Sequence, residues 1–181
     1  QELAAPPALT AMADEIEKEV AVLRQLPVKA PIKKNVRSRK QLEQFLMAKM
    51  EEELGGGYLL GSQKAWQKCG LIPAGLELRS LLVSLPTEQI AGFYDTDTKQ
   101  LYILADFSPV MQRMILSHEL THALQDQHFD LETLPMEVQD NDDLALTIRT
   151  LVEGGATVAM RDHFIRYPAG GGLLLSLLTL A

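Results

Sequence analysis

Two histidines four residues apart, His118 and His122, constrain this chain more than any other feature of its sequence. On an α-helix, residues at this spacing lie on one face, about 40° apart around the axis, so both imidazoles can reach one metal ion. Glu119 follows the first histidine and can lean over a water molecule bound to that metal. An HExxH pattern is how a zinc site places two ligands and a general base within five residues.

The pattern needs a continuous helix around it, and the neighbouring residues predict one. Ser108 can act as the N-cap, and Pro109 stands at the first helical position. Residues 110–127 contain no glycine or proline, and their apolar side chains fall on one side of a helix. These apolar residues are Met111, Met114, Ile115, Leu116, Leu120, Ala123 and Leu124. We therefore predict that this segment is a zinc-binding helix.

Composition excludes several classes of protein. A chain of 181 residues, of which 46% are hydrophobic, is long enough for one domain with a proper core. The net charge of −7 argues against a nucleic-acid partner. The single cysteine, Cys69, excludes an internal disulfide and a cysteine-rich zinc site. The basic stretch over residues 29–40 is interpreted as the solvated face of a strand and a helix.

The two ends of the chain carry weaker signals. No apolar run reaches the length of a membrane span, so no transmembrane segment is expected. The chain begins without the pattern of a signal peptide, and its polar start is compatible with a processed secreted or periplasmic protein.

Periodicity and breakers predict the other elements. Helices are expected over residues 9–26, 39–54, 58–69, 76–85 and 142–165, with a break at the three glycines 55–57 and a short strand at 32–37. Residues 90–94 and 100–104 read as a β-hairpin, in which Asp95 and Asp97 serve the turn rather than a calcium site. The second hairpin strand leads into the HExxH helix. We expect residues 102–104 to form an exposed edge that can hold an extended peptide.

A catalytic zinc site needs a third protein ligand and an open position for water. Glu153 precedes the small residues Gly154 and Gly155, which would allow its helix to approach another closely. His128 lies six residues after His122, as in metzincin peptidases, but the glycine that lets their helix turn back is Gln125 here. Cys69 is a third candidate for this ligand position. Glu153 is preferred as the third ligand, and His128 and Cys69 remain open as alternatives.

Residues around the metal are harder to assign. Gln125, three residues after His122, could support the metal site or belong to a solvated helix face. Several side chains could stabilise an oxyanion, and the sequence does not choose among them. These candidates are Tyr94, Tyr102, Arg149, Arg161, His163 and Tyr167.

Three segments together resemble uncharacterised bacterial zincin-type metallopeptidases of the gluzincin class, which have HExxH and a downstream glutamate ligand. They are Gly92-Phe93-Tyr94-Asp95 with Leu101-Tyr102-Ile103, the stretch from His118 to Leu131, and Glu153-Gly154-Gly155-Ala156. The resemblance implies a helix-rich α+β, zincin-like fold with a small mixed or antiparallel sheet whose edge strand precedes the HExxH helix. It implies one catalytic domain over residues 1–181, with an α/β part at 1–130 and a small helical part at 131–181.

The resemblance also implies a site. His118, His122 and Glu153 would bind Zn²⁺, Glu119 would be the general base, and the substrate would be a peptide or protein. One departure concerns Thr157, because thermolysin-like gluzincins have an aspartate there that orients a histidine. The expected function is a zinc-dependent peptidase, more specifically an endopeptidase. The alternatives are a zincin-like domain that binds zinc without efficient catalysis, as a binding or assembly module, and a structural domain with a chance HExxH.

Overall fold

The structure is a computed structural model that describes residues 3–82, 92–104, 107–136, 138 and 141–168. The chain forms two compact units, one from Gln1–Val36 with Ala91–Ala181 and one from Arg37–Ile90. Each unit is considered by itself below. The single domain predicted over residues 1–181, with parts that divide at residue 130, stays a prediction. Segments on both sides of residue 130 belong to the first unit.

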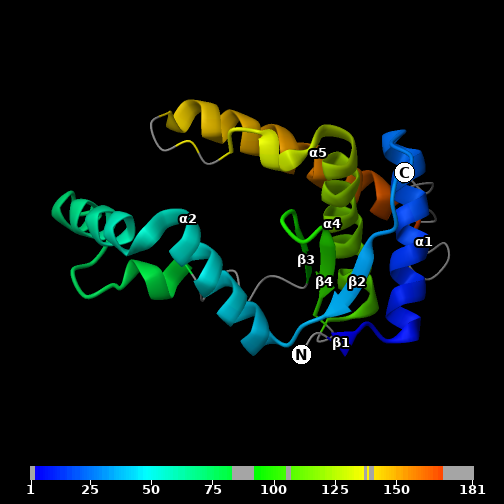
Figure 1. Ribbon diagram of the computed structural model, residues 1–181, viewed down its shortest axis with the longest axis horizontal. Coiled ribbons are helices and arrows are strands. Elements are labelled where there is room, and N and C mark those ends of the chain that lie inside the picture. The colour runs from blue at the N-terminus through cyan, green and yellow to red at the C-terminus, as the bar shows by residue number, and fades with distance from the viewer. Residues whose placement is uncertain (1–2, 83–91, 105–106, 137, 139–140, 169–181) are drawn as a thin grey trace, which may run out of the picture. The chain divides into compact units, whose positions relative to one another are not determined.

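A small mixed sheet lies in the first unit (Figure 1). Its strands in the described residues are β1 (Leu3–Ala4), β2 (Lys33–Val36), β3 (Gly92–Asp95) and β4 (Gln100–Ile103), in the order β1-β2-β4-β3. Strand β4 runs parallel to β2 and antiparallel to β3. The predicted strand at residues 32–37 and the predicted hairpin are therefore confirmed, although residues 90–91 of the hairpin lie outside the described residues.

The hairpin turn follows from local side-chain chemistry. Asp95 accepts a 2.6 Å hydrogen bond from the Thr98 hydroxyl, and Lys99 takes up a left-handed conformation at φ 54°. Aspartate and threonine favour turns because their side chains bond nearby groups in this way. Asp95 thus serves the turn, as predicted.

The predicted edge strand is wrong. Strand β4 leads into the HExxH helix, but it lies between β2 and β3 inside the sheet. The strand at the sheet's border on this side, within the described residues, is β3. The hairpin signal identified the antiparallel partner of β4. It could not reveal β2, because that parallel pairing joins residues more than sixty positions apart, such as Asn35 and Tyr102.

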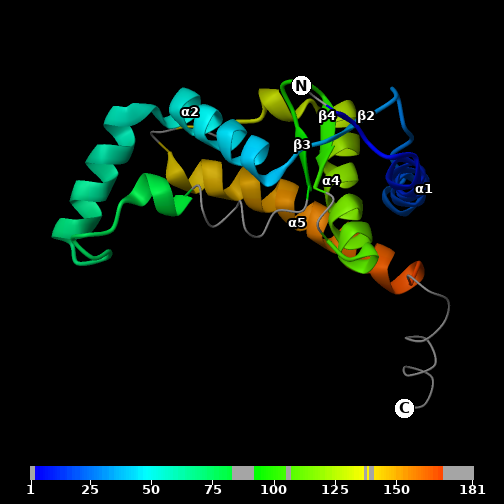
Figure 2. The same ribbon diagram turned by 90° about the horizontal axis from the view of Figure 1, so that it is seen from below.

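Helices α1 (Pro7–Arg24) and α4 (Pro109–Phe129) pack beside the sheet, and Figure 2 shows α1 end-on next to α4. Helix α4 begins as predicted, because Ser108 accepts a hydrogen bond from the Met111 N–H and Pro109 follows it. The apolar faces of both helices and one face of β4 form the hydrophobic core. Its buried members are Leu9, Ala13, Ile16, Val20, Ile32, Leu101, Ile103, Leu116, Leu120, Ala123 and Leu124.

Helix α5 (Asp142–Arg166) crosses α4 (Figure 1). Asn141 caps its start by accepting a 3.0 Å hydrogen bond from the Leu144 N–H. Its buried positions recur every three or four residues, which is the period of one helix face. They are Val152, Ala156, Ala159 and His163. These mostly small side chains allow the close helix contact that the sequence predicted, and of the two glycines named there only Gly155 adjoins a side chain of α4.

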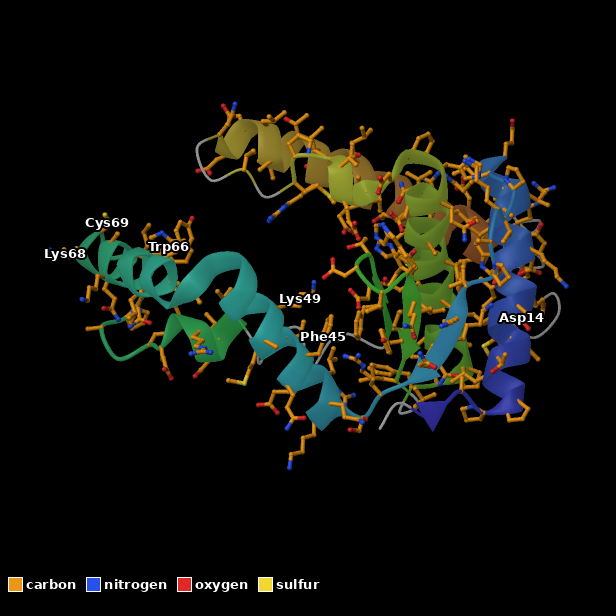
Figure 3. The ribbon with its side chains drawn as sticks, viewed as in Figure 1. Asp14, Phe45, Lys49, Trp66, Lys68 and Cys69 are labelled. Carbon is orange, nitrogen blue, oxygen red and sulfur yellow. The ribbon has the colours of Figure 1, made fainter. Side chains whose placement is uncertain are left out.

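The second unit is built on α2 (Arg39–Lys68). Figure 3 labels Phe45 and Trp66 on this helix and Cys69, the residue that caps its C-terminal end. Ser38 and Gln41 form a reciprocal capping box at its start. The predicted break at glycines 55–57 is wrong, because the helix continues through them. Glycine weakens a helix by about 1 kcal/mol per residue without forbidding helical angles. Residues 78–82 are helical, and the remainder of that predicted helix, 83–85, lies outside the described residues.

The described residues confirm the α+β class, with many helices and one small sheet. The zincin-like fold remains a prediction. None of the helices within the described residues is both long enough and apolar enough to cross a membrane.

Candidate metal centre

Helix α4 directs both histidines of the HExxH pattern to one point. The His118 and His122 rings meet edge to face, with centroids 4.7 Å apart. Their Nε2 atoms are 3.0 Å apart. Two imidazole nitrogens can approach this closely only if a proton or a metal cation lies between their lone pairs. The geometry is that of a ligand pair one helical turn apart.

Helix α5 brings Glu153 to the same point. Its Oε2 atom lies 3.1 Å from His118 Nε2 and 3.4 Å from His122 Nε2. Among the residues that the structure describes, these three form a group whose ligand atoms all lie within 4.8 Å of one another. The structure thus brings together the three predicted ligands from two helices, although Glu153 follows His122 by more than thirty residues in the chain.

The group fits a zinc ion by geometry and by chemistry. Tetrahedral zinc with bonds of about 2.0–2.2 Å needs ligand atoms roughly 3.3 Å apart. The three observed separations are 3.0, 3.1 and 3.4 Å. Two neutral imidazoles and one carboxylate are a known donor set for catalytic zinc. The Glu153 side chain is 61% exposed, so solvent reaches the group from this side.

The three side chains also hold one another's charges. Hydrogen bonds with His118 and His122 keep the pKa of the Glu153 carboxyl far below its usual range. Burial lowers the pKa of His122, but the bond to Glu153 and the charge of Glu119 outweigh it and raise the pKa above 6.5. The group therefore attracts positive charge, either as a proton on a histidine or as a metal cation. A bound metal would displace that proton, as at other metal sites.

Glu119 is held beside the ligands by strand β3. Its Oε2 atom accepts a 2.9 Å hydrogen bond from the backbone N–H of Tyr94. Burial raises the pKa of the Glu119 carboxyl, and the neighbouring histidines and the Tyr94 N–H oppose the rise. The Tyr94 contact fixes one carboxylate oxygen, Oε2, and an ionised carboxylate can accept further hydrogen bonds through both of its oxygens.

Gln125 belongs to the site and not to a solvated face. It is buried, and its amide oxygen lies 3.0 Å from His122 Nδ1. Its amide nitrogen donates a 3.2 Å hydrogen bond to the backbone carbonyl of Val152. The three-residue spacing from His122 signalled this proximity in the sequence. The partner in α5 could be found only from the packing of the two helices.

The other two candidate ligands are not part of this group. His128 Nε2 donates a 2.8 Å hydrogen bond to the backbone carbonyl of Pro27. Cys69 is exposed at the C-cap of α2, in the second unit (Figure 3). Neither belongs to the convergent group of His118, His122 and Glu153.

Most candidates for oxyanion stabilisation are bound to other groups. The Tyr94 hydroxyl donates to Asp126 at 2.8 Å, and Arg149 Nε donates to the Met136 carbonyl at 2.7 Å. The remaining candidates also have their own neighbours. Arg161 pairs with Asp162, His163 bonds Glu19, Tyr102 is buried against Phe93, and Tyr167 packs on His163.

Comparison of the chain with protein-family models, with curated protein sequences and with solved structures finds no match. The assignment of the site therefore depends on the residues and their geometry. Membership of a zincin family remains a prediction from the sequence resemblance.

Proposed function

We propose that the chain is a zinc-dependent peptidase in which His118, His122 and Glu153 hold the ion and Glu119 is the general base. The observation that carries the proposal is the convergence of three ligand atoms at 3.0–3.4 Å, as tetrahedral zinc requires. Glu119 adjoins this group and is fixed by the backbone of β3. A site used only to bind zinc would not need a second, partly buried carboxylate held beside it.

Zinc, when bound, would lower the pKa of a water molecule and polarise the scissile carbonyl. The protein's own part is to move the proton. Glu119 accepts the proton of the attacking water at Oε1 and later delivers it to the leaving amine. The Tyr94 N–H keeps the carboxylate in place during both transfers. Burial favours the protonated form of Glu119, which suits a group that must also act as an acid.

The test combines metal analysis with a peptide-cleavage screen. Protein purified without chelators should contain one zinc ion per chain and cleave members of a peptide mixture. Glu119→Gln should retain the zinc, because it leaves all three ligands in place, and lose roughly 10²–10⁴-fold in rate. Glu43→Gln, at an exposed position of α2, is the matched control and should cleave normally.

The competing functions give different results in the same experiment. Stoichiometric zinc with no cleavage by the wild type or by Glu119→Gln would indicate a zinc-binding module without catalysis. Absence of zinc even after incubation with excess metal would indicate a chance HExxH. Normal cleavage by Glu119→Gln would show that the assigned base is wrong.

A further inference from the structure

The Gln125 amide connects the two helices that carry the metal ligands. On one side its oxygen is 3.0 Å from Nδ1 of His122, a ligand on α4. On the other side its nitrogen donates at 3.2 Å to the carbonyl of Val152 on α5. Val152 is the residue immediately before Glu153, the ligand from that helix. One buried side chain therefore contacts both halves of the site.

The Val152 carbonyl decides which way the amide points. A carbonyl can only accept a hydrogen bond, so the NH₂ group of Gln125 must face it. The amide oxygen then faces His122 and can only accept. The His122 ring satisfies it by carrying its proton on Nδ1. In the neutral ring this tautomer leaves the lone pair on Nε2, the atom that points at His118 and Glu153.

Gly155 provides the space for this amide. A Cβ atom at Gly155 would lie 2.9 Å from Nε2 of Gln125, closer than real contacts allow. Its next contact, 3.5 Å from Arg24, is an ordinary one. At the neighbouring Gly154, a Cβ atom would meet nothing within 4 Å. The two adjacent glycines thus differ: the first is free to be replaced, and the second adjoins the Gln125 amide.

We propose that Gln125, seated against Gly155, is a positioning residue that fixes His122 as the tautomer with a free Nε2. It would also hold the segment that carries Glu153 at the correct distance from α4. The proposal rests on the proposed zinc function for its biological meaning. The tautomer, however, is a property of the metal-free protein and can be tested separately. In thermolysin-like gluzincins an aspartate four residues after the glutamate ligand orients a histidine. The corresponding residue here is Thr157, which is exposed. The residue that contacts His122 is instead Gln125, on the same helix as the histidine.

The first readout is the tautomer of His122 in the metal-free protein, from its ring-nitrogen chemical shifts by NMR at alkaline pH. The wild type should show the Nδ1–H form. Gln125→Ala removes the acceptor, so His122 should shift toward the Nε2–H form that histidine favours in water. Gly155→Ala should produce the same shift with little loss of stability, because the end of the Gln125 side chain can move aside. Gly154→Ala is the matched control and should keep the wild-type tautomer.

The second readout is zinc affinity, by competition with a chromogenic chelator. Gln125→Ala and Gly155→Ala should each bind zinc about 10–100-fold more weakly, the range for loss of a ligand's outer hydrogen-bond partner. Gly154→Ala should bind like wild type. If Gly155 acts through Gln125, then Gly155→Ala should have little further effect in a Gln125→Ala background. If the losses of zinc affinity from the two substitutions were additive in the double variant, Gly155 would not act through Gln125 and would serve only the packing of the helices.

The two proposals fail in different ways. If Gln125→Ala kept the Nδ1–H tautomer and full zinc affinity, Gln125 would not be a positioning residue, and the zinc function would be unaffected. If the wild type showed the Nδ1–H form, lost in Gln125→Ala, but bound no zinc, the tautomer assignment would hold and the proposed function would fail.

Discussion

The backbone N–H of Tyr94 donates a 2.9 Å hydrogen bond to Oε2 of Glu119, while its hydroxyl donates at 2.8 Å to Asp126. One residue of β3 is thus fixed to α4 at two points, almost two helical turns apart. Asp126 is nearly inaccessible to solvent and also accepts bonds from Lys99 and from the Leu131 N–H. The polar end of α4 therefore sets the position of the strand that holds Glu119, the proposed general base.

Tyr94→Phe tests this arrangement, because it removes only the hydroxyl. Asp126 loses one of its partners, and we expect the free energy of unfolding to fall by about 1–3 kcal/mol in urea denaturation. The backbone bond to Glu119 should persist, so zinc affinity should not change. Tyr58→Phe, at an exposed position of α2, is the control and should leave stability unchanged. A large loss of cleavage rate at unchanged stability would instead place the Tyr94 hydroxyl at the substrate.

The third ligand is tested by comparing Glu153→Gln with His128→Gln. Loss of a direct ligand should cost more than the roughly 10–100-fold in affinity that an outer partner costs. Glu153→Gln should therefore weaken zinc binding by more than that range in a chelator competition. His128 bonds the Pro27 carbonyl, and His128→Gln should retain wild-type affinity. The reverse result would move the third ligand to His128, as in the metzincin alternative.

Local patterns were enough to predict the parts of the site that lie on one helix. The start of α4 follows from Ser108 and Pro109, and the meeting of His118 and His122 follows from helical spacing. The small residues after Glu153 also indicated a close helix contact. Gly154 and Gly155 looked equivalent in the sequence, but only Gly155 adjoins a neighbouring side chain.

Features that join distant segments could not be predicted. The parallel pairing of β2 with β4 removes β4 from the sheet edge, and no local signal marks it. The bond from Gln125 to Val152 depends on the packing of α4 against α5. The continuation of α2 through glycines 55–57 shows a different limit, because helix propensity is a weak preference that the rest of a helix can override.

The predicted solvated face at residues 29–40 is wrong for Lys34. Its side chain is 7% exposed and pairs with Glu17, which is also buried, and with Asp14 at 2.7 Å. Figure 3 labels Asp14 on α1. Burial lowers the pKa of Lys34, but the bonds to Asp14 and Glu17 outweigh it and raise the pKa above 10.5. The ammonium group is therefore charged at neutral pH and neutralises buried acid.

Lys34→Met should consequently destabilise the first unit. Removing one member of a buried ion pair leaves Glu17 uncompensated, and we expect a loss of about 3–5 kcal/mol in denaturant unfolding. Lys33→Met, at the exposed neighbouring position of β2, is the control and should change stability by less than about 0.5 kcal/mol. Adding Glu17→Gln to Lys34→Met should recover part of the loss. A cost equal to that of Lys33→Met would mean that the pair contributes nothing.

His163 should give the stability a distinctive dependence on pH. It is buried on α5, and its Nε2 donates a 2.7 Å hydrogen bond to Glu19, which also pairs with Arg113 at 3.2 Å. Burial lowers the pKa of His163 below 6.5, the Arg113 charge lowers it further, and the acids Glu19 and Glu15 oppose the shift. Below pH 6.5 the unfolded chain then binds a proton that the folded protein does not. His163 therefore contributes stability above pH 6.5, and this contribution is lost as the pH falls toward the lowered pKa.

The measurement is the difference in unfolding free energy between wild type and His163→Gln, at several pH values from about 7.5 to 5. Taking the difference cancels the titration of groups that the substitution does not touch. We expect the wild-type advantage to be largest at the upper end and to shrink steadily below pH 6.5. An advantage that grew on acidification would mean that His163 is charged in the folded protein and that its ion pair with Glu19 outweighs the cost of burial.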